Sequence, residues 1–217
     1  MRLILISMAY SQFNSIMKLK ALFPEIDIEE GVLKPKNYAK IEPSVSLTEG
    51  LDYSTPFALK ANTEKARSEM IVTPILLEVL RKMKDTIGIF SGNELNVDKK
   101  LGLNGVCDFL LSSNIESSFM MVPILTIVEA KKDDIPAGQW QCIAEMIGAE
   151  RFNKMNGYDV SPIIGLVTNG LEWQFLKKEG NKVMVNPTSL YINNLAELLG
   201  WLVGLISLAK VTKIVKK

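Results

Sequence analysis

The sequence predicts a mixed α/β fold with a central β-sheet flanked by helices. Residues 62–80 place apolar side chains at helical spacing, and residues 139–152 do so again. Residues 87–111, 122–130 and 163–185 contain short apolar or alternating runs that are typical of strands. Because helical and strand-like segments alternate along the chain, we expect them to pack as layers around one core.

Residues 1–61 are predicted to form an N-terminal extension on this core. Residues 11–22 favour a helix, and a proline-containing segment that is irregular or partly extended follows. Residues 1–9 faintly resemble a signal peptide, but their apolar run is at the short limit, so we expect a cytoplasmic protein. No residue of the extension indicates a chemistry, and we expect it to cover the core or to contact a partner subunit.

A helix is expected to begin after Asn62. Thr63 can cap its first turn, where Glu64 is favourable because the helix dipole is positive at that end. Pro74 interrupts the apolar stripe and is expected to kink the helix or to split it in two. Glu69 lies just before this proline, beside the apolar stripe.

Three strands are expected next. Residues 87–98 and 106–111 favour a pair of strands joined by turn residues. Residues 120–130 favour a third strand, and the short polar link of residues 112–118 predicts that it is antiparallel to its neighbour. A strong helical pattern begins after Gly138.

The last part of the core is predicted to be a hairpin. Residues 163–168 favour a buried strand, and an Asn-Gly turn leads into the alternating residues 171–176. A further short strand is expected over residues 183–185. These elements complete a core that we expect to span residues 62–185.

Residues 186–217 are predicted to be a C-terminal strand and helix extension of the same domain. The final helix is expected over residues 194–210. Its apolar stretch, Leu198–Ala209, is too short to span a membrane, so no membrane is expected as a partner. The lysines that follow favour a helix C-terminal end: Lys213, Lys216 and Lys217.

The composition narrows the chemistry. Of 217 residues, 47% are apolar and 23% charged, and the formal net charge is +1, so DNA binding would need a local basic patch. Histidine is absent, which excludes histidine general bases, Ser-His triads and histidine zinc sites. Cys107 and Cys142 lie in apolar surroundings, and we expect buried free thiols.

A candidate site lies where residues 122–132 turn from apolar to charged. In a strand, residues two apart point to the same face, so Glu129 and Lys131 project together at the end of a buried strand. Asp108 also interrupts an apolar run, and a carboxylate is seldom buried without a partner. Two acids and a lysine on one strand pair suit a divalent-metal site for phosphodiester hydrolysis.

This arrangement resembles the PD-(D/E)xK nuclease superfamily, which includes many restriction endonucleases, exonucleases and resolvases. The resemblance covers residues 62–176: a glutamate-bearing helix, a strand with Asp108, a strand that ends in Glu129-Ala130-Lys131, and a helix with a glutamine. It implies a restriction-endonuclease-like α-β-β-β-α-β core with a mixed central sheet. It also implies an enzyme that hydrolyses DNA with Mg²⁺ or Mn²⁺.

The resemblance assigns roles on the two central strands. Asp108 matches the metal-binding aspartate, and Glu129 matches the second acidic ligand, with the Ala130 carbonyl able to supply another oxygen. Lys131 matches the lysine that orients or activates the attacking water and stabilises the developing charge. The proline of the family motif is absent from the segment before Asp108.

The helices are predicted to supply two more residues. Glu69 matches the first-helix glutamate of some branches, although Glu64 or Glu78 could take its place. Gln141 matches the glutamine of the following helix, with Gln139 as the alternative. The predicted metal ligands are Asp108, Glu129, Glu69 and Ala130.

Other interpretations remain open. Glu129 and Lys131 could form an exposed ion pair that leads into the charged run 131–134, or the protein could keep a nuclease-like fold only for binding or assembly. Trp140 and Trp173 are expected in the core or at its rim, and Lys177-Lys178 as a solvated end. The apolar extensions, especially the C-terminal helix, lead to the hypothesis of a homodimer.

Overall fold

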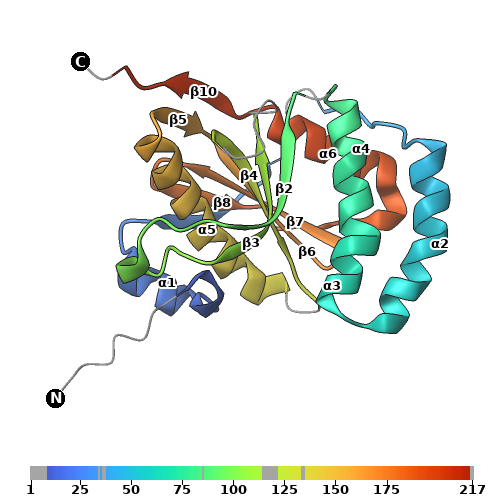
Figure 1. Cartoon of the computed structure of the whole chain (residues 1–217), viewed down its shortest axis with the longest axis horizontal. Helices are drawn as coiled ribbons and strands as arrows, with labels where there is room; N and C mark the ends of the chain where they lie inside the picture. Colours follow the sequence, from blue (N-terminus) through green and yellow to red (C-terminus); the bar gives the residue numbers. More distant parts are fainter. Residues whose placement is uncertain are drawn as a thin grey trace.

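A large mixed β-sheet forms the centre of the protein, and helices lie against it (Figure 1). The structure, a computed structural model, describes residues 9–33, 35, 38–84, 86–113, 122–132 and 135–215. The strand order is β1 (Asp27–Glu30), β8 (Lys182–Val185), β7 (Glu172–Glu179), β6 (Ile163–Thr168), β4 (Ile124–Ala130), β3 (Val106–Ser112) and β2 (Gly88–Glu94), with β9 (Leu190–Tyr191) beside β7. The predicted mixed sheet flanked by helices is therefore confirmed.

The sheet is antiparallel except at two places. Strands β2, β3 and β4 are antiparallel neighbours, as predicted for β4 from its short link to β3. Strand β6 then pairs with β4 in parallel, after the chain has crossed over through α5 (Ile135–Met155). The second parallel pair joins β1 to β8, far apart in sequence. Glu129 and Ala130 thus lie at the end of an interior strand.

Helices cover both faces of the sheet. Gly165 of β6 faces α5: a Cβ there would lie 2.5 Å from Met146 Sδ and 3.2 Å from Leu176 Cβ, so only glycine permits this close packing. Leu176 lies in β7, and the residue before it, Phe175, points to the other face of the sheet. The Phe175 ring packs 5.2 Å from that of Trp201 in α6 (Leu195–Ile206). The apolar C-terminal helix is therefore part of the core.

Pro74 organises the helical run before β2. The chain forms α3 (Glu64–Arg67), a π-helical turn (Ser68–Val72) and α4 (Thr73–Lys82), with the proline in the first turn of α4. Proline has no N–H, so it cannot donate to the Met70 carbonyl four residues earlier. Ser54 Oγ donates to that carbonyl at 2.7 Å. The predicted interruption is confirmed, and so is the Thr63 cap, which accepts from Ala66 N at 3.1 Å.

The N-terminal region holds a helix that the sequence pattern did not predict. Helix α2 (Val45–Ala61) buries only three residues and contains Pro56, so its helical signal is weak. Its cap, Ser44, donates through N and Oγ to the buried Glu78 carboxylate at 2.9 and 3.0 Å, which joins α2 to α4. Elsewhere in this region are α1 (Ile16–Leu22) and a 3₁₀ turn, Tyr10–Gln12.

The chain end also differs from the prediction. Lys213 does not end a helix but lies in β10 (Lys210–Lys213), which pairs with β5 (Tyr158–Ser161) in a separate two-stranded sheet. Short 3₁₀ turns occur at Lys99–Leu101 and Ile192–Asn194. Among the described residues, no helix combines the length and the apolar composition needed to cross a membrane.

Several predictions lie outside the described residues. They are the signal-peptide-like residues 1–8, most of the polar link and the strand start over residues 114–121, the acidic residues 133 and 134, and the terminal lysines 216 and 217. The two cysteines are described: Cys107 and Cys142 are buried free thiols, as predicted. Burial raises the pKa of both thiols, so both stay protonated at neutral pH.

Candidate active site at the ends of strands β3 and β4

The pairing of β3 with β4 brings Asp108 and Glu129 together. The ladder pairs Phe109 with Val128, and continuing this register places Asp108 opposite Glu129. There the Ala130 N–H donates to Asp108 Oδ2 at 2.7 Å instead of to a backbone carbonyl. The aspartate therefore ends the ladder with its side chain, and the two predicted acids are neighbours.

Lys131 lies between one of these acids and a glutamine. Its Nζ is 2.5 Å from Glu129 Oε1 and donates to Gln141 Oε1 at 3.1 Å. Glu129 is only 1% exposed, so the ion pair is not the exposed strand end that the alternative interpretation required. Gln139 instead bonds to Gln174, which leaves Gln141 as the glutamine at the site.

Gly138 lets helix α5 approach the lysine closely. A Cβ at this position would lie 2.7 Å from Val167 Cγ1 and 2.9 Å from Lys131 Cγ. A side chain there would push the first turn of α5 away from β4 and β6. The glycine therefore helps to place Gln141 within hydrogen-bonding distance of the ammonium.

Glu145 is a site residue that the sequence interpretation missed. It lies one helical turn after Gln141, is fully buried, and accepts from Gln141 Nε2 at 3.1 Å. The signal was present in the sequence, because Glu145 is an acid within the apolar run 142–149, just as Asp108 interrupts an apolar strand. Helical glutamates are so often exposed that the run alone did not single it out.

Burial and mutual repulsion raise the pKa values of these acids. Burial, then the charge of Asp108, raises the pKa of Glu129 to about 8, although Lys131 acts in the opposite direction. Burial, then the charge of Glu129, raises the pKa of Glu145. Burial also raises the pKa of Asp108, against the lowering effect of the Ala130 N–H. The site concentrates negative charge that a cation would relieve.

Lys131 remains a cation in this setting. Burial alone would lower the pKa of its ammonium, but the charge of Glu129 and its hydrogen bond, followed by the charges of Glu64 and Asp108, raise it. A lysine held in this way donates hydrogen bonds and stabilises negative charge. It becomes a better base only when the neighbouring carboxylates are neutralised.

The structure does not bring Glu69 to this cluster. Its side chain is 59% exposed and pairs with Lys65 at 2.8 Å, one turn away on the helix surface. Glu64, at the start of α3, is the helix acid whose charge raises the pKa values of Asp108 and Glu129. Glu78 is buried at the contact between α2 and α4, where it accepts hydrogen bonds from Ser44 and pairs with Lys82 at 3.3 Å.

Only part of the predicted set of Mg²⁺ ligands comes together in the structure. In the described ranges, no three acidic or cysteine residues form a group that could hold a metal ion. Two carboxylates are sufficient for Mg²⁺, however, because this ion keeps several waters and uses substrate oxygens as ligands. Glu129 Oε2 is buried and makes no hydrogen bond within the described structure, so one hard oxygen remains available. The Ala130 carbonyl stays a predicted ligand.

The other singled-out residues are structural. Trp173 is buried and donates from Nε1 to the Gly170 carbonyl at 3.2 Å, and Trp140 is half-buried, as expected for core and rim aromatics. Lys178 is not solvated as predicted: it is buried and pairs with Glu150 at 2.6 Å. Lys177 pairs with Glu179 at 3.0 Å.

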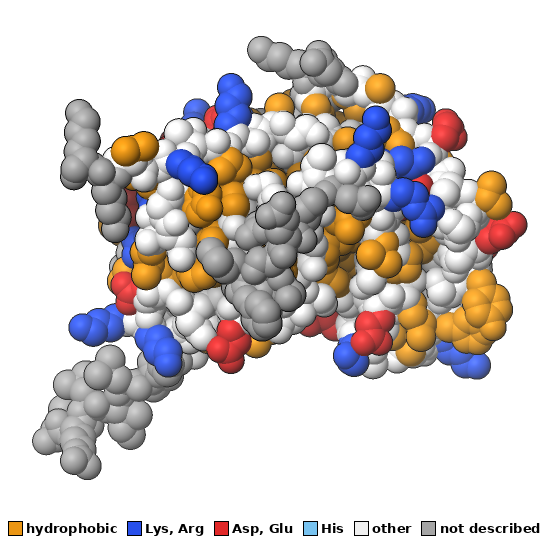
Figure 2. Space-filling view, turned by 45° about the horizontal axis from the view of Figure 1, so that its top comes forward, with side chains coloured by type: hydrophobic (Ala, Val, Ile, Leu, Met, Phe, Trp, Pro, Cys, Tyr) orange, Lys and Arg blue, Asp and Glu red, His pale blue; other side chains and the backbone are white. Residues whose placement is uncertain are grey.

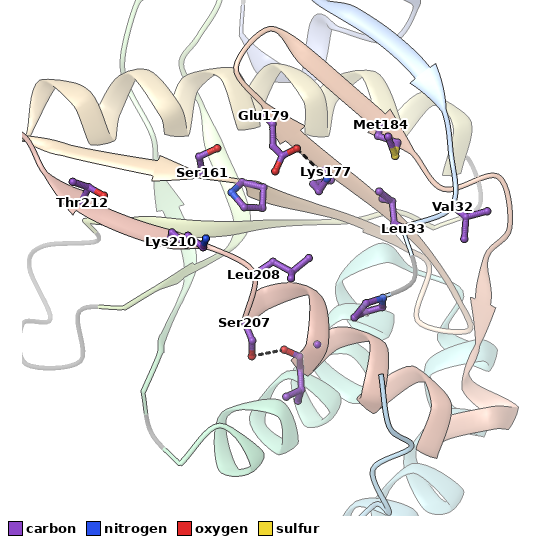
Figure 3. Close-up of a pocket in the computed structure, with 14 residues that line it drawn as sticks. Val32, Leu33, Ser161, Lys177, Glu179, Met184, Ser207, Leu208, Lys210 and Thr212 are labelled. Carbon is purple, nitrogen blue, oxygen red and sulfur yellow. Dashed lines mark hydrogen bonds and ion pairs between the residues drawn. The ribbon is translucent and has the colours of Figure 1, made fainter. Parts of the chain in front are cut away.

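A separate hollow of about 1,120 Å³ lies between β7, α6 and β10 (Figure 3). Its lining combines the Lys177–Glu179 ion pair with apolar side chains that include Leu33, Met184 and Leu208. None of the lining residues belongs to the acidic cluster on β3 and β4. The hollow is therefore distinct from the candidate active site.

Comparison with models of known protein families and with the sequences of characterised proteins finds no match to the chain.

Proposed function

We propose that the protein is a Mg²⁺- or Mn²⁺-dependent nuclease that hydrolyses DNA at Asp108, Glu129 and Lys131. The observation that carries this proposal is the meeting of two opposed carboxylates on adjacent strands with an ammonium that a glutamine holds. The order of elements supports the PD-(D/E)xK resemblance, because a helical run precedes β2, β3 and β4, and α5 crosses over to β6. DNA as the substrate comes from this resemblance.

Asp108 and Glu129 are the residues that would hold the metal. A bound divalent ion supplies a water of lowered pKa and neutralises charge on the scissile phosphate. The buried, unpartnered Oε2 of Glu129 and the repulsion between the two acids both favour cation binding. The Ala130 N–H holds Asp108 through Oδ2, so the second carboxylate oxygen, Oδ1, is the one that would bind the metal.

Lys131 acts on the substrate side as a hydrogen-bond donor. Its ammonium can donate to a phosphate oxygen or to the attacking water while Glu129 and Gln141 hold its position. Negative charge increases on the phosphate oxygens as the water attacks, and a fixed cation at that point stabilises the transition state more than the ground state.

Gln141 and Glu145 hold the Lys131 ammonium in place because Glu145 fixes the orientation of the Gln141 amide. A lysine ammonium has three donors and no acceptor, so the atom of Gln141 that faces it must be the carbonyl oxygen. The amide nitrogen then points to Glu145, which accepts from it. Glu145 is therefore a positioning residue in this proposal and does not touch the substrate.

The alternative is a protein of nuclease-like fold that binds or assembles without catalysis. One observation favours it: the described residues offer no third acidic ligand, because Glu69 faces solvent. A DNA cleavage assay separates the two functions. The same protein is incubated with supercoiled plasmid and with single-stranded DNA, with Mg²⁺, Mn²⁺ or EDTA.

The decisive variants preserve shape while removing charge. Asp108→Asn can still accept from the Ala130 N–H, and Lys131→Met keeps the length of the side chain. We expect metal-dependent cleavage that both variants lower by about a hundredfold or more. Lys182→Met is the matched control. Lys182 lies away from the site, where it pairs with Glu29 at 2.7 Å. No cleavage by the wild type, or cleavage that Asp108→Asn leaves unchanged, would refute the proposal.

A further inference from the structure

Helix α2 exposes an aromatic face. Its three buried residues, Leu47, Leu51 and Ala58, lie on one side of the helix. Tyr53 and Phe57 lie away from them, 74% and 53% exposed, with ring centroids 5.3 Å apart. Figure 2 shows hydrophobic side chains on the surface at the right of the molecule, where Figure 1 places α2. An exposed aromatic pair at helical spacing is typical of a binding surface.

Charged residues complete this face. With 3.6 residues per turn, Glu49, Tyr53 and Lys60 align along the side opposite the buried residues, and Asp52 flanks them. None of these three charged side chains forms an ion pair with another described residue. The acids lie towards the start of the helix and the lysine towards its end.

This distribution makes the face complementary to itself. Consider a second copy packed antiparallel, with the two-fold axis at the level between residues 54 and 55. Glu49 and Lys60 are equally far from that level, about 8 Å along the helix. Glu49 of each copy then faces Lys60 of the other, and Tyr53 of each copy lies over the aromatic pair of the other. A two-fold interface requires this kind of self-match.

Nucleic acid and membrane fit the same face less well. Glu49 and Asp52 outnumber Lys60 there, and two carboxylates repel phosphates and anionic lipid head groups. We propose that the chain forms a homodimer through α2, with the two helices antiparallel about a two-fold axis. One helix pair makes a small interface compared with the roughly 1,200 Å² that stable complexes bury, so we expect a weak dimer with a dissociation constant of about micromolar order. This proposal does not depend on the nuclease proposal.

The test measures molar mass by sedimentation equilibrium between about 1 and 100 μM, a range that spans micromolar dissociation constants. We expect a monomer–dimer equilibrium that Tyr53→Ser abolishes within this range. Glu49→Lys and Lys60→Glu alone each weaken the dimer by roughly tenfold, because two like-charged contacts replace two ion pairs. The double variant restores it. Met17→Ser is the control, because Met17 is 78% exposed on α1, away from α2 (Figure 1).

The outcomes separate the occupants of the face. A wild-type monomer at all concentrations overturns the proposal, and so does a dimer that neither Tyr53→Ser nor Glu49→Lys weakens. Single-stranded oligonucleotide and phosphatidylglycerol vesicles are tested in parallel. The dimer proposal is also overturned if the wild-type protein is a monomer that binds the oligonucleotide or the vesicles and if Tyr53→Ser abolishes this binding. All substitutions are at exposed positions, and thermal unfolding checks that each variant is folded.

Discussion

At the scale of single residues, the site is a chain of contacts from strand to helix. Asp108 accepts from the Ala130 N–H, Glu129 pairs with Lys131, and Lys131 donates to Gln141. Glu145 ends the chain inside the core. Each member depends on the charge or polarity of the next, so single substitutions are expected to act beyond the residue replaced.

Replacing Glu145 tests the polarity of this chain. Glu145→Leu removes the acceptor for Gln141 Nε2, so the amide is free to turn and Lys131 loses its fixed partner. Glu145→Gln retains an acceptor oxygen. We expect about 10- to 100-fold slower cleavage for the leucine variant and near wild-type cleavage for the glutamine variant.

Nitrogen-15 NMR of the lysine side chains reports on the same chain without activity. Glu145→Leu is expected to move the Lys131 Nζ resonance, and Glu145→Gln to leave it nearly in place. An unmoved resonance in a folded Glu145→Leu protein would contradict the positioning role. Gln141→Leu provides a second variant that breaks the contact at its other end.

The raised pKa of Glu129 predicts how stability depends on pH. Burial and Asp108 move this pKa from 4.5 to about 8 in the folded protein, so between these values the folded state binds more protons than the unfolded state. The metal-free protein should therefore lose stability as pH rises from about 5 to 8, by at least about 1 kcal/mol. Glu145, whose pKa is also raised, acts in the same direction.

Urea unfolding at several pH values measures this slope. Glu129→Gln cannot ionise, so its free energy of unfolding should fall less between pH 5 and 8 than that of the wild type. Glu172→Gln serves as the control, because Glu172 is a partly exposed glutamate that accepts from Ser189 Oγ at 2.7 Å. Equal slopes for the wild type and Glu129→Gln would show that Glu129 does not ionise in this range.

At the scale of elements, the predictions succeeded where burial on all sides left long apolar runs in the sequence. Strands β4 and β6 are buried along their whole length, and α5 is buried over most of its turns. Strands β1, β5 and β10 have four residues each, most of them exposed, so no alternation of buried and exposed positions distinguished them. The stability of α2 depends on contacts from distant segments, which its own sequence does not display.

The bond from Ser54 to Met70 is such a contact. Ser54→Ala should lower the free energy of unfolding by about 1 kcal/mol, because the Met70 carbonyl loses its 2.7 Å donor. Pro74→Ala restores a backbone N–H that can bond to this carbonyl. In the Pro74→Ala background, Ser54→Ala should therefore cost less. Urea unfolding of the wild type, the two single variants and the double variant completes a double-mutant cycle. If Ser54→Ala costs the same in both backgrounds, the N–H that Pro74→Ala introduces does not replace Ser54 as the donor to Met70.

At the scale of the whole molecule, the sheet joins segments whose neighbourhood no local pattern encodes. Strand β1 pairs with β8, and β5 with β10. Asp108 and Glu129 could be paired from sequence because a short link makes β3 and β4 adjacent. Glu69 was predicted at the site but lies away from it, for a different reason. The prediction assumed a constant α-helical period, but Glu69 lies in a π-helical turn, and it is Glu64 whose charge acts on the site.

Metal binding is expected to stabilise the whole fold. A ligand that binds only the folded state adds about 2.7 kcal/mol at a hundred times its dissociation constant. Mg²⁺ or Mn²⁺ should therefore raise the melting temperature of the wild type. Asp108→Asn should remove the increase, whereas Asp98→Asn, which changes a turn cap, should keep it. An increase of the same size in the Asp108 variant would place the ion elsewhere.

The hydrogen bond from Ala130 to Asp108 has a consequence for how the site can be observed. An amide that donates to a carboxylate changes its chemical shift and its exchange with solvent when that carboxylate gains a proton or a cation. The Ala130 amide is thus a natural reporter in the backbone, one bond away from the chemistry. A single resonance of the unmodified protein can follow protonation, metal loading and substrate arrival.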